Sequence, residues 1–130
     1  MTRPPAQHAC AGVNALCYHF AMDMDALVTF AQRMEARFRA VDGDILTPRE
    51  RTYAQLAKLG EEYGELCEQV LAMDGHQRAD KADKFGKEKL DGELADVVMV
   101  CFILAERLGV NLPEAIGKKV KVVEERFGDA

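Results

Sequence analysis

The sequence lacks several features that define common classes of protein. It contains no tryptophan, a residue that stacks on sugar rings, and this disfavours a carbohydrate-cleaving enzyme that works with paired acids. The apolar run from Val97 to Leu104 is far too short to cross a membrane. Walker A, GxGxxG and GxSxG motifs are absent, which removes the best-known phosphate loops and nucleophile elbows from consideration.

The cysteines form none of the usual metal or disulfide patterns. There are four, with no CxxC pair and no zinc-ribbon spacing: Cys10, Cys17, Cys67 and Cys101. The N-terminal stretch is also a poor signal peptide, because polar residues interrupt its apolar part. We therefore expect free thiols in a reducing compartment, with the cytoplasm as the default location.

The composition is that of one soluble globular domain. Of the 130 residues, 48% are apolar and 30% are charged, which is enough apolar material for a core. The formal net charge is −5, and no basic stripe with interleaved aromatic residues appears. We expect no nucleic acid and no membrane as partners, although metal ions would allow an acidic protein to bind a polyphosphate.

Apolar residues recur at three- and four-residue steps, and no stretch alternates as a strand does. The sequence predicts an all-α, four-helix bundle-like domain over residues 24–130, preceded by an N-terminal extension over residues 1–23. The four helices are expected at about 25–41, 48–73, 88–108 and from 112 onward. The last helix is predicted to turn four apolar residues inward: Ile116, Val120, Val123 and Phe127. Long apolar stripes in so small a chain favour a homodimer or homotetramer.

Local signals mark the helix ends. Thr47, Pro48 and Glu50 form a capping box with proline at the first helical position. Gly109 is expected to end the third helix, since glycine is favoured at the first position after a helix. Asn111 is the expected N-cap of the fourth helix.

Two pairs of carboxylates stand out on the predicted helices. Glu62 and Glu65 form one pair and Glu93 and Asp96 the other, each spaced i, i+3, so that both members project from one helix face. Four converging carboxylates repel one another unless a hard divalent cation neutralises them. Because no histidine lies near either pair, oxygen ligation favours Mg²⁺ or Mn²⁺ over zinc or iron. The alternative is a solvated helix edge, with Lys58 paired to Glu62.

Three segments together resemble the MazG-type nucleoside triphosphate pyrophosphohydrolases, an all-α superfamily with an ExxE motif followed by an ExxD motif. They are KLGEEYGEL at residues 58–66, ELADVV at 93–98 and LGVNLPEA at 108–115. One ExxE motif is weak, whereas two acidic pairs in these contexts are much more specific. The resemblance extends roughly from Leu27 to Phe127 and leaves the N-terminal extension unmatched.

The resemblance implies an enzyme that hydrolyses (deoxy)nucleoside triphosphates between the α- and β-phosphates, giving a monophosphate and pyrophosphate. It implies that Glu62, Glu65, Glu93 and Asp96 are the Mg²⁺ ligands. Glu61 matches the first acid of the Glu-Glu-x-x-Glu motif, so its implied role is to orient or deprotonate the attacking water.

The sequence departs from the family pattern at two points. Gly92 precedes Glu93 where many relatives carry an acid, and Val122 stands four residues before Arg126 where relatives often carry a lysine. The candidate phosphate-binding residues are Lys58, Lys119, Lys121 and Arg126. Two alternative functions stay open: a phosphoribosyl-ATP pyrophosphohydrolase, and a catalytically silent helical module for protein contacts or nucleotide sensing.

Overall fold

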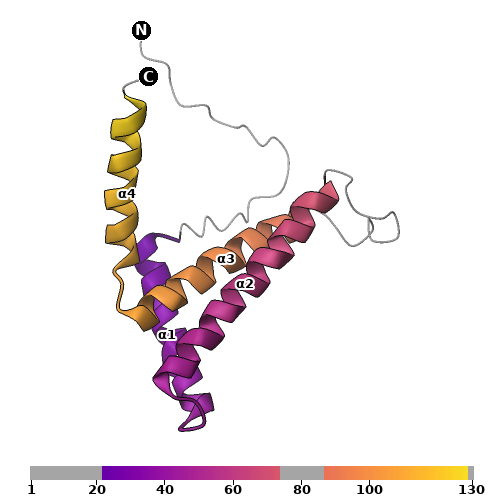
Figure 1. Cartoon of the computed structure of the whole chain (residues 1–130), viewed down its shortest axis with the longest axis vertical. Coiled ribbons are helices and arrows are strands. Elements are labelled where there is room, and N and C mark those ends of the chain that lie inside the picture. The colour runs from indigo at the N-terminus through magenta and orange to yellow at the C-terminus, as the bar shows by residue number, and fades with distance from the viewer. Residues whose placement is uncertain (1–21, 74–86, 129–130) are drawn as a thin grey trace, which may run out of the picture.

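The computed structural model describes residues 22–73 and 87–128, and within them all regular structure is helical. The four helices are α1 (Met24–Asp42), α2 (Pro48–Met73), α3 (Lys87–Leu108) and α4 (Leu112–Phe127) (Figure 1). The predicted fold class is confirmed, and the expected helix boundaries agree within a residue or two. Cys10, Cys17 and the predicted N-terminal extension, apart from its last two residues, lie outside the described residues. None of the described helices is both long and apolar enough to span a membrane.

The ends of the helices form as their local sequences predict. Thr47 donates its backbone N–H to the Glu50 carboxylate at 2.8 Å, and the Glu50 N–H donates to the Thr47 hydroxyl at 3.2 Å, which completes the capping box of α2. The Asn111 side chain accepts the Glu114 N–H at 3.1 Å and caps α4. Gly109 has a φ of +67°, a backbone conformation that few side chains tolerate, and this ends α3.

Helix α3 is the central element. It packs against both α1 and α2, and α2 and α3 run side by side in opposite directions (Figure 1). The apolar core lies between α1 and α3, where Ala31, Phe102 and Ile103 are buried and Phe30 and Phe38 pack against them. These contacts account for Phe102 and Ile103 of the apolar run from Val97 to Leu104, whereas Val98 of the same run is exposed.

The inward face of α2 is polar. Its buried residues are Gln55, Glu62 and Gln69, spaced seven apart so that they lie along one stripe of the helix. The apolar neighbours Leu56 and Tyr63 are exposed instead. Burial of a carboxylate among amides is costly unless each polar group has a partner, so Glu62 needs a partner on or near α2.

The prediction that α4 turns its apolar residues inward is wrong for a single chain. Helix α4 contains no buried residue, and Phe127 is 80% exposed. Figure 1 shows α4 extending away from the α2–α3 pair. Periodicity correctly identifies one apolar face of α4, but it does not say whether the same chain or another covers that face.

Candidate metal centre

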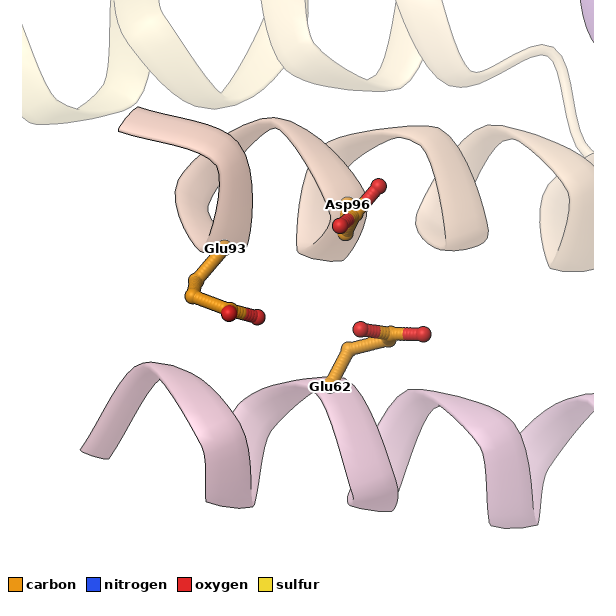
Figure 2. Close-up of side chains that lie close together, drawn as sticks. All are labelled: Glu62, Glu93 and Asp96. Atoms are coloured by element: carbon orange, nitrogen blue, oxygen red, sulfur yellow. The ribbon is translucent and has the colours of Figure 1, made fainter. Parts of the chain in front are cut away.

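Three of the four predicted ligands lie together where α2 faces α3. Glu62, Glu93 and Asp96 each offer a carboxylate oxygen, and these oxygens all lie within 4.8 Å of one another. Figure 2 shows Glu62 pointing from α2 toward α3, and Glu93 pointing from α3 into the same space. We call these three residues the acidic triad. Two chain segments thus supply one group of hard oxygen donors.

The fourth predicted ligand, Glu65, is exposed and is not among the three close oxygens. It nevertheless lies within the electrostatic field of the acidic triad. Partial desolvation, followed by the negative charges of Glu62 and Glu93, raises the pKa of Glu65. Glu65 lies one helical turn from Glu62 on α2 and is affected by Glu93 of α3, so it stands at the rim of the acidic triad.

The burial of Glu62 is the most unusual feature of the site. This glutamate is only 6% exposed, and Lys58 Nζ lies 2.7 Å from its Oε1 atom. Lys58 also contacts Glu61 at 3.0 Å, and its hydrogen bonds to Glu62 and Glu61 raise the pKa of its ammonium. The predicted Lys58–Glu62 contact is therefore present, but it coexists with the acidic triad instead of replacing it.

The acidic triad brings three carboxylates together, and Lys58 contacts one of them. Lys58 pairs with Glu62 of the acidic triad and is shared with Glu61. Partly buried carboxylates in this number are stabilised best by a cation that several oxygens hold at once.

The donor set fits magnesium better than a soft metal. Opposite ligands of an octahedral Mg²⁺ lie about 4 Å apart, so oxygens within 4.8 Å of one another need only small side-chain rotations to reach that geometry. The group contains no nitrogen or sulfur donor, which disfavours zinc and iron.

The remaining predicted site residues lie outside this cluster. Glu61 is exposed on α2 and contacts Lys58, so it borders the site without pointing into the triad. Lys119, Lys121 and Arg126 are exposed on α4, the helix that extends away from α2 and α3 (Figure 1). Their phosphate-binding role stays a prediction.

Sequence reasoning missed one prominent feature of the interior, a buried ion pair between Glu35 of α1 and Arg107 of α3. Arg107 Nη2 lies 2.7 Å from Glu35 Oε2, and the two side chains are 7% and 6% exposed. The signal in the sequence was indirect, because Glu35 directly follows Met34 of the apolar stripe and so falls beside the core-facing side of the helix.

A small all-α chain with an acidic group between two antiparallel helices defines a candidate carboxylate metal protein. Comparison with known families agrees with this class. The profile of the MazG-like family matches residues 64–128, half of the chain, and includes Glu65, Glu93 and Asp96. The chain belongs to the MazG-like family, which is related to the nucleotide pyrophosphohydrolases and whose enzymes are typically metal-dependent. No curated protein and no solved structure gave a significant match.

Proposed function

We propose that this protein is a Mg²⁺-dependent pyrophosphohydrolase that cleaves (deoxy)nucleoside triphosphates between the α- and β-phosphates. The observation that carries the proposal is the acidic triad: oxygens from Glu62, Glu93 and Asp96 converge between α2 and α3. Membership of the MazG-like family supports the reaction class. A role in removing surplus or non-standard nucleotides fits this reaction.

The acidic triad is the proposed metal cage, with Glu65 as a fourth ligand from its rim. A bound Mg²⁺ supplies charge neutralisation for the phosphates and lowers the pKa of a coordinated water; Mn²⁺ has the same preference for oxygen. Such ions hold the phosphates of a substrate together with a small number of carboxylates.

The neighbouring polar residues have separate proposed roles. Lys58 contacts the Glu62 and Glu61 carboxylates at 2.7 and 3.0 Å, and its proposed role is to contact a phosphate oxygen beside the triad. Glu61 is exposed to solvent and is the proposed residue for orienting or deprotonating the attacking water. The remaining phosphate contacts are assigned to Lys119, Lys121 and Arg126.

The products provide the direct test of this function. We expect a nucleoside triphosphate incubated with the protein and Mg²⁺ to yield monophosphate and pyrophosphate, because the family reaction cleaves the α–β anhydride. Ion-exchange chromatography resolves these products. Diphosphate with orthophosphate would place the cut at the wrong bond, and intact nucleotide across a panel that includes phosphoribosyl-ATP would favour the silent-module alternative.

Metal binding should stabilise the folded protein. Mg²⁺ that binds the native state alone is expected to add about 1–3 kcal/mol at strongly saturating concentration, which appears as a higher melting temperature. A Glu93→Gln/Asp96→Asn double variant should lose the shift because two of the three triad carboxylates are gone. The same shift in the double variant would show that the ion acts on other surface acids.

We further propose that the chain functions as a homodimer or homotetramer. Among the described residues, α4 has no buried side chain, and large apolar side chains of the other helices are also exposed, among them Leu56, Tyr63, Leu94 and Val98. Uncovered apolar faces of this extent favour association with a further copy. We expect light scattering at micromolar concentration to give a multiple of the 14.4 kDa chain mass, whereas a monomer would contradict the proposal.

A further inference from the structure

A polar cavity lies apart from the acidic triad, where α1, the start of α2 and the end of α3 meet. Its volume is about 240 Å³, and its walls are Glu35, Arg39, Pro48, Arg51, Thr52 and Arg107. Thr52 and Glu62 are about 15 Å apart along the axis of α2, from the rise per residue of an α-helix. The cavity is therefore separate from the candidate metal centre within one chain.

Positive charge dominates this arginine cavity. Three guanidinium groups, one from each helix, line it together with a single carboxylate, Glu35. Glu35 is shared between two of them, with Arg107 at 2.7 Å and Arg39 at 3.3 Å. A smaller adjoining cavity adds one further acid, Asp42, beside Arg51 and Arg107. The lining of the two cavities together keeps an excess of positive charge.

Arg51 carries the part of this charge that no described carboxylate neutralises. Its Nη1 atom donates to the carbonyl oxygen of Gly43 at 3.0 Å. Among residues 22–73 and 87–128, no carboxylate lies within ion-pair distance of Arg51. A guanidinium has five N–H donors in a planar fork, so most of the donors of Arg51 remain for a ligand.

The position of the cavity at the N-terminal turn of α2 adds to its preference for anions. The partial positive charge of a helix N-terminus acts on the space beside Pro48 and Thr52. Glu50, the acid of this first turn, accepts two hydrogen bonds from Thr47 and is not part of the cavity wall.

We propose that the arginine cavity is a binding site for a small phosphate-class oxyanion, orthophosphate or pyrophosphate, that needs no divalent metal. Paired N–H donors of arginine match the oxygens of a phosphate group. The volume of 240 Å³ lies below the range of sites for drug-sized ligands, so the cavity fits the anion itself rather than a whole nucleotide. This site is additional to the proposed active site and does not depend on it.

Calorimetric titration of the full chain with orthophosphate and with pyrophosphate tests the proposal, in EDTA and at constant ionic strength. We expect saturable binding of at least one of the two to the unchanged protein. Arg51→Gln should weaken this binding about tenfold or more, because charge-assisted hydrogen bonds are lost. The matched control is Arg37→Gln, which removes the same charge from an exposed position of α1 outside the cavity and should bind normally.

Two further variants keep the result unambiguous. Arg51→Lys retains the charge without the planar fork and should also bind more weakly, which covers the case in which Arg51→Gln fails to fold. Asp96→Asn should bind the anion as the unchanged protein does, even though the proposed hydrolysis requires Asp96. Absence of saturable binding, equal binding by Arg51→Gln, or equal weakening by Arg37→Gln would each overturn the proposal.

Discussion

Asp96→Asn and Glu62→Gln are each expected to reduce nucleotide turnover at least about 100-fold, because metal-ion stabilisation contributes several kcal/mol to such reactions. Both residues belong to the acidic triad, and a neutral amide is a poorer ligand for a hard cation than a carboxylate. The helical fold should persist, since each substitution preserves the size of the side chain. The measurement is initial rate with saturating Mg²⁺, accompanied by far-UV circular dichroism.

A matched control separates the triad from general charge effects. Glu68→Gln removes one carboxylate from an exposed position of the same helix and should keep normal turnover. Asp96→Asn should also melt at a higher temperature than the unchanged protein in metal-free buffer, since it removes a charge that the neighbouring carboxylates Glu62 and Glu93 repel. Wild-type rates in Asp96→Asn and Glu62→Gln would refute the assignment of these residues as metal ligands.

The largest expected effect on stability comes from the buried pair between α1 and α3. Glu35→Ala should lower the free energy of unfolding by about 3–5 kcal/mol, because it leaves the buried guanidinium of Arg107 without its carboxylate partner. The loss is measured by denaturant unfolding, as a lower midpoint of the transition.

Two comparisons distinguish the ion pair from simple packing. Arg39→Gln removes the mostly exposed partner of Glu35 and should cost less than about 1 kcal/mol. A Glu35→Leu/Arg107→Met double variant replaces both charges by apolar groups and should regain most of the stability lost in Glu35→Ala. If the double variant were as unstable as Glu35→Ala, an uncompensated charge would not be the cause.

Helix ends were predictable because their signals are local. The capping box joins Thr47 to Glu50, three residues away, and the positive φ of Gly109 ends the helix directly before it. Neither feature depends on the packing of other helices. The i, i+3 spacing of Glu93 and Asp96 likewise places both side chains on one face of their helix, whatever that helix packs against.

The composition of the triad was only partly predictable. Periodicity selects the helix face that carries Glu62 and Glu65, but the fold decides which member of this pair is buried against α3. The packing of α2 on α3 buries Glu62 and leaves Glu65 at the rim. That choice depends on the crossing and register of two helices, which are long-range properties.

The sequence by itself determined four helices, their ends and the two acidic pairs, because each follows from neighbours within one or two turns. Only the tertiary structure brought Arg39, Arg51 and Arg107 from three helices to one cavity and paired Arg107 with Glu35. It also showed that α4 has no buried residue in the part of the chain that the structure describes. Residues far apart in the sequence meet only through packing of the whole domain, so no local pattern encodes their contact.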